Sequence, residues 1–582
     1  MGGTSTERRV SLPMVIAIGL TCALAVPASA GVTWDPNSAR ILNRPRTCNV
    51  PSGGSCTDSG GSFLNGEPMS AISSDGTADY LHVLWTSDRP SGNDSRPLVT
   101  YSTICDTSAP GGITPPYCAG VYYARSSDGG TTWDGGGSGA DPFPLSPLTM
   151  HADRGSIAAS GQYVYAVYVT EVGYYTQMCA NSPRVLYVRV NDNYGAAGNW
   201  GPLIQLTDAS GKVDYPSMSA AGNSVYIIHT DETTGDLVTD VSTDSGATWV
   251  SSAIGNTRAT YDNHKSPGAP TCVNPPTPAS LEGLGGMPAI AGNGSQVGAS
   301  WISSDNGRLV VKVSTDNGVT WPGGAGGYPC TSGGTDACTQ HMTPRGSNAS
   351  GSGSGSGKYW WWSASNIAAS GTGSSGRIGV VWTNDDGTGN NCGGSPCVIP
   401  KGVYVRVWTA AGGWAPMRLV ACFTTELSCG GSSLATTHNA GYYPAIAMYG
   451  TGGIGIAWAA CPIGPKAPCN QKATGKLQDP GAELIWKESG DGTTWFNGSS
   501  PPGPYQNIAA NTASACGTPS TDPCSKMNEW PGIVFDKPGD GAAGCGQDGS
   551  SPEAGCVRYV FFVGRTFDYS HYRIYLQTGT QR

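Results

Sequence analysis

Short apolar runs separated by turn-forming residues recur along the whole chain. Runs such as 121–124, 237–241 and 309–313 have the alternation and the Ser, Asp and Gly boundaries of β-strands joined by tight turns. No long window shows the period of an amphipathic helix. We therefore predict an all-β protein.

The strands belong to a repeating unit. A short segment resembling x-P-x-I-A is followed about ten residues later by a strand that usually ends in an aromatic residue. Seven such units begin at Pro68, Gly155, Pro216, Pro288, Ser365, Pro444 and Pro531. Each unit supplies three strands and, with one more, the content of a four-stranded β-propeller blade.

We predict one β-propeller domain over residues 31–582, with seven blades and with six as the alternative. The last unit ends in a strand at 572–576 with no fourth strand after it. The segment at 39–42, before the first unit, is expected to supply that strand. Closure by an N-terminal strand would remove the exposed sheet edge.

An octapeptide of the form S-x-D-x-G-x-T-W occurs at 126–133, 242–249 and 314–321. Its Asp can accept backbone N–H bonds, its Gly can take a positive φ, and its Trp can cover the next strand, so it predicts a hairpin turn. A degraded copy at 488–495 keeps only the Gly-x-Thr-Trp end.

The octapeptides resemble the Asp-box repeat of the sialidase superfamily. The resemblance implies a propeller in which each box joins the third and fourth strands of a blade, on the side away from the active site. The boxes are then structural. Sialidases have six blades, and the seven units depart from that number.

The first 30 residues indicate a cleavable secretory signal. Arg8 and Arg9 precede an apolar run and then Ala28-Ser29-Ala30, so the mature chain is expected to begin near Gly31 and to be secreted or periplasmic. No later segment reaches the roughly 20 apolar residues of a membrane span. We expect a monomer.

The cysteines favour disulfides. Without Cys22, which lies in the signal, 18 of the 19 cysteines remain, an even number for an exported chain. Their spacing favours pairing between sequence neighbours, for example Cys422 with Cys429 and Cys545 with Cys556.

Charge and motifs exclude several function classes. Loss of the signal removes one acidic and two basic residues, which changes the net charge from −9 to −10, and no basic run occurs, so nucleic acid is not an expected partner. No phosphate-binding glycine loop, zinc signature or nucleophile elbow is present. Calcium ligands from Asp536, Asp540 and Asp548 are a weak possibility beside solvated turns, so no cofactor is expected.

The resemblance implies that ligands bind where the inner strands begin and the second strands end. Acidic and aromatic residues gather at those positions. Carboxylates there can act as acid and base in glycoside cleavage, and Trp and Tyr can stack on sugar rings. The candidate catalytic residues are Glu67, Glu171, Asp231, Glu282 and Tyr443. The candidate substrate-binding residues are His151, Arg154, Asp214, Tyr215, Trp360, Trp361, His438 and Trp530.

The resemblance also implies roles for particular residues. Tyr443 and Glu282 occupy positions at which they could form the Tyr–Glu nucleophile pair of sialidases, and Arg154 could be one of the three arginines that bind the substrate carboxylate. The fifth unit has tryptophans where another arginine belongs. We therefore expect a neutral or weakly charged glycan rather than sialic acid.

Three classes of function remain open. The first is a secreted glycoside hydrolase that uses a carboxylate pair. The second is a non-catalytic propeller that binds glycans or proteins. The third is a polysaccharide lyase in which His151, His438 or Tyr443 removes a proton beside a uronate carboxylate.

Overall fold

The computed structural model describes residues 32–34, 40–41, 65–88, 119–133, 143–147, 151–171, 184–211, 213–231, 236–256, 288–303, 308–321, 340–341, 366–384, 402–422, 438–450, 452–462, 483–489, 506–507, 527–535, 556–565 and 572–581.

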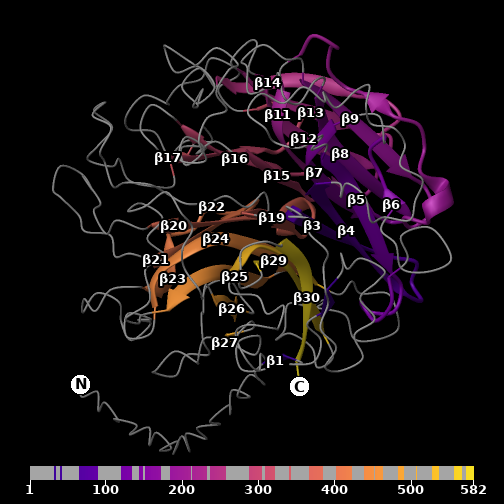
Figure 1. Ribbon diagram of the computed structural model, residues 1–582. Coiled ribbons are helices and arrows are strands. Elements are labelled where there is room, and N and C mark those ends of the chain that lie inside the picture. Colours follow the sequence, from indigo (N-terminus) through magenta and orange to yellow (C-terminus); the bar gives the residue numbers. More distant parts are fainter. Residues whose placement is uncertain are drawn as a thin grey trace, which may run out of the picture.

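The structure is a seven-bladed β-propeller, which confirms the predicted fold and blade number (Figure 1). Each blade is an antiparallel sheet whose strands follow one another in chain order from the centre outward. Blade 1 contains β3 (Asn65–Ser74), β4 (Asp79–Asp88), β5 (Ala119–Ser126) and β6 (Phe143–Pro144). Blade 2 contains β7 (His151–Ser160), β8 (Tyr163–Glu171), β9 (Arg184–Asn191) and β10 (Ile204–Gln205). Blade 3 contains β11 (Val213–Ala221), β12 (Ser224–Asp231), β13 (Asp236–Ser242) and β14 (Val250–Asn256).

The remaining blades have the same order. Blade 4 contains β15 (Ala289–Gly292), β16 (Val297–Ser303), β17 (Arg308–Ser314) and β18 (Gln340–His341). Blade 5 contains β19 (Ile367–Ser370), β20 (Arg377–Asn384), β21 (Gly402–Thr409), β22 (Gly413–Trp414) and β23 (Arg418–Cys422). Blade 6 contains β24 (His438–Tyr449), β25 (Gly453–Pro462), β26 (Glu483–Ser489) and β27 (Gln506–Asn507). Blade 7 contains β28 (Met527–Phe535), β29 (Val557–Arg565) and β30 (Tyr572–Gln581).

N-terminal strands close the ring, as predicted. β1 (Val32–Trp34) pairs antiparallel with the end of β30, and β2 (Arg40–Ile41) pairs with its middle. The predicted segment at 39–42 is thus joined by a second strand that the sequence pattern did not indicate. Together they cover the outer edge of blade 7.

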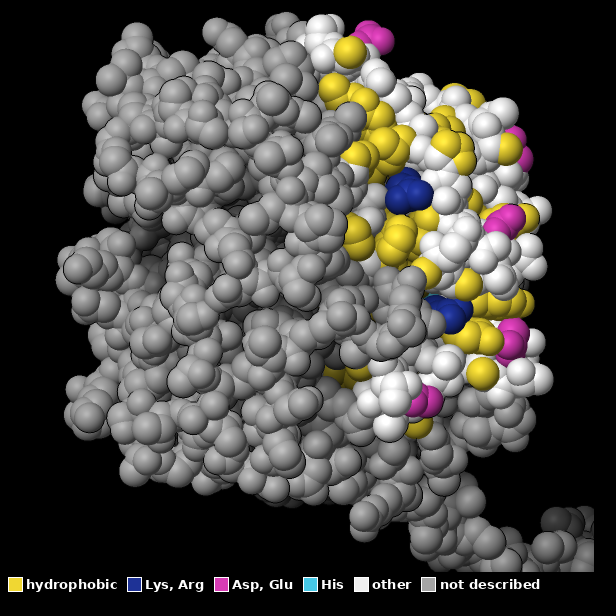
Figure 2. Space-filling model, turned by 45° about the vertical axis from the view of Figure 1, so that its right-hand side comes forward, with side chains coloured by type: hydrophobic (Ala, Val, Ile, Leu, Met, Phe, Trp, Pro, Cys, Tyr) yellow, Lys and Arg dark blue, Asp and Glu magenta, His cyan; other side chains and the backbone are white. Residues whose placement is uncertain are grey.

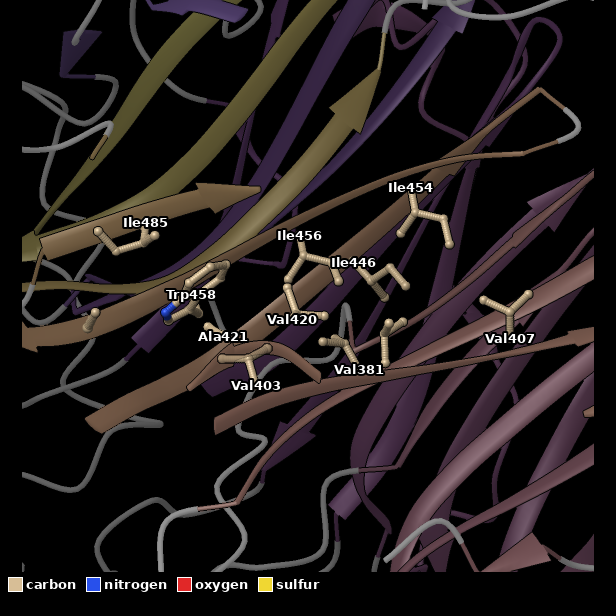
Figure 3. Packing of buried hydrophobic residues seen from close by; sticks show 12 residues of the cluster. Val381, Val403, Val407, Val420, Ala421, Ile446, Ile454, Ile456, Trp458 and Ile485 are labelled. Carbon is tan, nitrogen blue, oxygen red and sulfur yellow. The ribbon is translucent and has the colours of Figure 1, made fainter. Parts of the chain in front are cut away.

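Seven apolar clusters hold the blades together, one between each blade and the next. The cluster between blades 5 and 6 combines valines of β20, β21 and β23 with Ile446, Ile456 and Trp458 (Figure 3). The last cluster joins blade 7 to blade 1, where Phe561 and Leu576 pack with Leu81 and Trp85. Each fully buried aliphatic or aromatic side chain contributes about 1.5–3 kcal/mol. The core is therefore a closed ring of interfaces rather than one central cluster.

Buried or partly buried cations connect blades 2, 4 and 6 to the blades that precede them. In blades 2, 4 and 6 a third-strand side chain donates a hydrogen bond to an outer carbonyl of the preceding blade. Arg189 Nη1 donates to Leu145 O at 3.1 Å and Lys312 Nζ to Ile254 O at 2.6 Å, and Lys487 Nζ donates to Val420 O. Burial lowers the pKa of Lys312 to about 8 and moves that of Lys487 well below its ordinary value.

The three octapeptides form one turn with the same hydrogen bonds. In the copy at 314–321, Ser314 Oγ accepts the N–H of Gly318 and Asp316 Oδ1 accepts the N–H of Thr320, both at 2.9 Å. The other two copies repeat both bonds. Gly318 has a φ of +82°, and a Cβ there would lie 3.2 Å from Val241 of the preceding blade. The turn therefore requires glycine for both backbone conformation and packing.

Blade 2 contains a variant of this turn that the sequence motif did not reveal. Asn191 Oδ1 accepts the N–H groups of Asn193 and Gly195, each at 2.9 Å, in the place of the serine hydroxyl. Asn191 pairs with Val164 as Ser242 pairs with Val225, so the two turns occupy the same register. An amide oxygen thus replaces the hydroxyl as acceptor.

The degraded copy in blade 6 starts one residue later than its sequence alignment placed it. Ser489 pairs with Ile454 as Ser314 pairs with Val297, so Ser489 takes the first position of the motif. The copy then keeps its Ser and, at Asp491, its Asp, with one residue fewer before the Thr-Trp end. Glu488 lies outside the motif and accepts a hydrogen bond from Arg558 Nε at 2.9 Å.

Several sequence expectations concern residues with little or no structural description. Asp536, Asp540 and Asp548 lie outside the described residues. Cys422 and Cys556 are disulfide-bonded, while the predicted pairings stay predictions. The helical turns among the described residues have neither the length nor the apolarity of a membrane-spanning helix.

Candidate functional site

The candidate site residues that the structure describes lie at the face of the ring where the innermost strands begin, here called the start face. Strand pairing places the end of each second strand and the beginning of each third strand at the same face. In blade 2, His151 stands opposite Glu171, which stands opposite Arg184. The octapeptide turns follow the third strands and lie at the opposite face. Figure 2 shows part of the surface, on which charged side chains are few and scattered.

In the part of the chain that the structure describes, five innermost strands carry a β-bulge close to the start face. In each, the register shifts so that two residues face one residue of the second strand. The first residues of these pairs, here called the bulge residues, are Glu67, Arg154, Tyr215, Tyr443 and Trp530. A proline or glycine follows every one of them. The bulges occupy blades 6, 7, 1, 2 and 3, which are successive around the ring.

The backbone is strained at three of the bulge residues. Arg154, Tyr215 and Tyr443 have φ values of 52°, 51° and 51°. A left-handed conformation costs a non-glycine residue about 1–2 kcal/mol. Bulges re-aim side chains beside active sites, and strain of this kind is typical of functional positions. Tyr194, Ser245 and Asn317 have the same conformation in the turns of the opposite face, so the start face differs in that its strained residues lie inside strands.

A buried carboxylate ties two of the bulge residues together. Asp214, which is fully buried, forms ion pairs with Arg154 and with Arg184, the latter at 2.7 Å. Its Oδ1 also accepts the N–H of Tyr215 at 2.9 Å. The guanidinium of Arg154 lies over the Tyr215 ring, 4.1 Å from its centre. One carboxylate thus fixes strained residues of two adjacent blades.

The electrostatics of this group favour the ionised carboxylate. Burial alone would raise the pKa of Asp214, but the charges of Arg154 and Arg184 and the hydrogen bonds to the carboxylate lower it below the ordinary value. Arg154 and Arg184 keep 21% and 11% of their side-chain surface exposed. Asp214 therefore lies beneath the two arginines and is not itself presented to a ligand.

The other candidates are described in different detail: the side chains of Asp231 and Tyr443 are described, some residues have only their backbone described, and the rest are not described. Asp231 ends β12, is partly exposed and pairs with Val213 at the beginning of β11. Tyr443 is 6% exposed. Glu67, His151, Glu171, His438 and Trp530 are placed by their backbones alone, at the start-face ends of their strands. Glu282, Trp360 and Trp361 lie outside the described residues.

Sequence reasoning missed two residues of this region. Arg184 begins the third strand of blade 2, and a single arginine at such a position forms no recognisable sequence motif. His229 stands opposite the bulge at Tyr215 and Pro216, and its place in the middle of an apolar strand gave no signal. Among the described residues, no group of three His, Cys, Asp or Glu side chains has the arrangement of a metal site.

The solved structures that resemble this chain include sialidases. Hadza microbial sialidase Hz136 is 12% identical with a TM-score of 0.35, and the match covers 68% of this chain and 63%, less than two thirds, of that one. The intramolecular trans-sialidase from Ruminococcus gnavus is 10% identical with a TM-score of 0.34, and the match covers 68% of this chain and 90% of that one. The NanB sialidase from Streptococcus pneumoniae is 12% identical with a TM-score of 0.35, and the match covers 73% of this chain and 67% of that one. No family model and no curated protein matches the chain. At these values the likeness carries no argument about function, and the propeller assignment rests on the sheet topology.

Proposed function

We propose that this chain binds a glycan at the start face and hydrolyses it there. The observation that supports the proposal is the set of bulge residues in five successive blades, three of them strained. One glutamate, one arginine, two tyrosines and one tryptophan thus occupy equivalent backbone positions around one face. A positive φ in a turn serves to reverse the chain, whereas at Arg154, Tyr215 and Tyr443 it lies inside a strand, where chain reversal does not require it.

The chemistry of these side chains suits a carbohydrate. Tyr and Trp offer flat apolar faces to sugar rings and polar edges to hydroxyl groups. Hydrolysis needs an acid and a second carboxylate separated by about 5–10 Å. In this proposal Glu67 is one carboxylate of the catalytic pair, and Glu171, Asp231 and Glu282 are the candidates for the second carboxylate.

The substrate is proposed to be neutral or weakly charged. Arg154 and Arg184 both pair with Asp214, so the arginines described in this cluster already have a carboxylate partner before any ligand arrives. The role as an exported enzyme rests on the predicted signal at residues 1–30. Tyr443 is proposed to act at the reacting carbon, in line with its strained position in blade 6.

The test is a screen of the chain from Gly31 onward against chromogenic glycosides and polysaccharides. Reducing ends and ultraviolet absorbance are measured in parallel. We expect reducing ends without ultraviolet absorbance, and a loss of at least about 100-fold in rate for Glu67→Gln or Asp231→Asn if either supplies acid–base catalysis. Asp192→Asn is the matched control, because Asp192 is exposed at the opposite face.

Other outcomes would favour other functions. Ultraviolet-absorbing products would indicate a lyase. Cleavage of a sialoside would show that the expectation of a neutral substrate is wrong. A folded protein that binds glycans but cleaves none would be a non-catalytic propeller.

A further inference from the structure

Blade 3 breaks a pattern that the other six blades share. Five blades have a bulge that faces one second-strand residue, and blades 4 and 5 have an equivalent residue by register. At this position six blades place a large aromatic side chain and blade 3 places a histidine: Trp85, Tyr168, His229, Trp301, Trp382, Trp458 and Phe562. Diagonal to it on the third strand, four blades place a cation and blade 3 places an acid: Ala124, Arg189, Asp240, Lys312, Arg406, Lys487 and Gln577. Blade 3 therefore replaces an aromatic–cation pair with a histidine–carboxylate pair.

The histidine has acceptors at both ring nitrogens. His229 is 2% exposed, with Nε2 3.0 Å from Asp240 Oδ2 and Nδ1 3.4 Å from the carbonyl oxygen of Thr230. A neutral imidazole donates from one nitrogen only, whereas the protonated ring donates from both. Asp240 is also buried, and its Oδ1 accepts the hydroxyl of Ser251. Each ring nitrogen thus faces an oxygen, and a ring with a single N–H can donate to only one of the two.

The same histidine is connected to the candidate site. It stands opposite the bulge that begins at Tyr215. Its neighbour Thr230 donates its hydroxyl to the carbonyl oxygen of Asp214 at 3.1 Å. Asp214 in turn holds Arg154, Arg184 and the N–H of Tyr215. A change in the hydrogen bonds of His229 can therefore affect Asp214 and its partners through Thr230, at the end of β12.

The charged groups on and beside the strands near the histidine come from five described strands. β13 contributes Asp240, β11 contributes Asp214, and β9 of blade 2 contributes Arg184, which is paired with Asp214. Asp231 follows at the end of β12. Glu171 ends β8 and is placed by its backbone alone. Asp240 is the charged group in direct contact with the ring.

We propose that His229 is a positioning residue that makes the blade 3 bulge sensitive to pH. The protonated ring bridges Asp240 and the end of β12 and so holds Asp214 and Tyr215 in place. Loss of the proton removes one of the two hydrogen bonds and leaves the acid without a cationic partner, so the bulge opens more often. Histidine is the side chain whose ordinary charge change falls between about pH 5 and 8. Its consequence for glycan cleavage rests on the proposed function, whereas the opening of the bulge does not.

Hydrogen exchange followed by mass spectrometry tests the proposal in the intact chain. Exchange of residues 213–219 is compared with that of 441–447, after correction for the intrinsic effect of pH. The second segment is the internal control, because its bulge at Tyr443 faces Trp458. From pH 5.5 to 8.0 we expect opening of 213–219 to rise about tenfold relative to 441–447, the effect of losing one buried hydrogen bond. Equal changes in both segments would overturn the proposal without any variant.

Two variants locate the effect at the histidine. His229→Gln keeps a hydrogen-bond donor but cannot gain a proton, and it is expected to abolish the differential response. The double variant His229→Trp with Asp240→Ala gives blade 3 the pair that blade 1 has at Trp85 and Ala124, and it serves if the single variant does not fold. A wild-type response in either variant would contradict the role of His229.

A hydrolase assay separates this proposal from the proposed function. If a glycoside is cleaved, the wild type should lose kcat/KM from pH 5.5 to 8.0 about tenfold more than His229→Gln does, in parallel with the exchange data. If no glycoside is cleaved but the differential exchange is found, the pH-sensitive bulge stands and the proposed hydrolase fails. Cleavage with no differential exchange gives the reverse result.

Discussion

At the scale of single residues, buried charges are the feature that most affects this protein. Asp214 has two arginine partners, whereas Lys312 and Lys487 donate to backbone carbonyls that carry no full charge. The first arrangement lowers the pKa of an acid below its ordinary range, and the second lowers the pKa of a base. Both make stability depend on pH, in different ranges.

Asp214→Asn should lower the free energy of unfolding by about 3–5 kcal/mol, because it leaves two largely buried arginines without their carboxylate. The pKa of Asp214 is lower in the folded state, so its contribution is present above about pH 4 and is lost as the pH falls through the folded value. Urea unfolding at pH 7 measures the loss. A change below about 0.5 kcal/mol, as expected for a surface site, would contradict this assignment.

Lys312→Met should flatten the stability profile at alkaline pH. The pKa of Lys312 is about 8 in the folded state, and it is about 10.4 for an ordinary lysine, so between these values the unfolded chain binds more protons and stability rises with pH. The variant should lose part of that rise, and Lys487 should retain the rest. Denaturant unfolding from pH 7.5 to 10.5 measures the slope, and an unchanged slope would refute the prediction.

At the scale of elements, the turn between the third and fourth strands depends on its first side chain. Ser314 in blade 4 and Asn191 in blade 2 perform the same task with different chemistry, since each accepts backbone N–H groups two and four residues ahead. What the turn needs is an acceptor at that point in the register. A motif written for serine therefore overlooks blade 2.

Asn191→Ala should destabilise the protein by about 1–3 kcal/mol, because the N–H groups of Asn193 and Gly195 lose their acceptor, and that of Gly195 is buried. Asn191→Ser is the matched control and should cost less, since serine is the acceptor in three other blades. Thermal unfolding ranks the variants. Equal losses for alanine and serine would show that the amide does more than accept these bonds.

At the scale of the whole molecule, the ring depends on joining its two ends. Apolar clusters lie between all successive blades, including blades 7 and 1, and the strands near residues 32–41 cover the free edge of β30. Figure 1 shows the C-terminus beside β1. An unpaired edge is a template for pairing with another chain.

A chain that begins at residue 43 should unfold at a lower temperature and self-associate, because it lacks β1 and β2. The chain that begins at Gly31 is the control. Size-exclusion chromatography and a melting curve at several concentrations measure both effects. A shortened chain that stays a single species with the same melting temperature would show that ring closure does not depend on these strands.

Local pattern by itself determined the fold of this protein. The repeated P-x-I-A segments and aromatic-ended strands predict seven blades, because strand alternation and turn chemistry are properties of neighbouring residues. The octapeptide turns and the closing strand near Arg40 were readable for the same reason. Only the tertiary structure decided what depends on contacts between blades. It placed Asp214 beneath Arg154 and Arg184, aligned Ser489 with the other turns and set His229 against Asp240. These partners come from separate strands, and in part from separate blades, so their distances are fixed by sheet register and blade packing, which no local pattern contains.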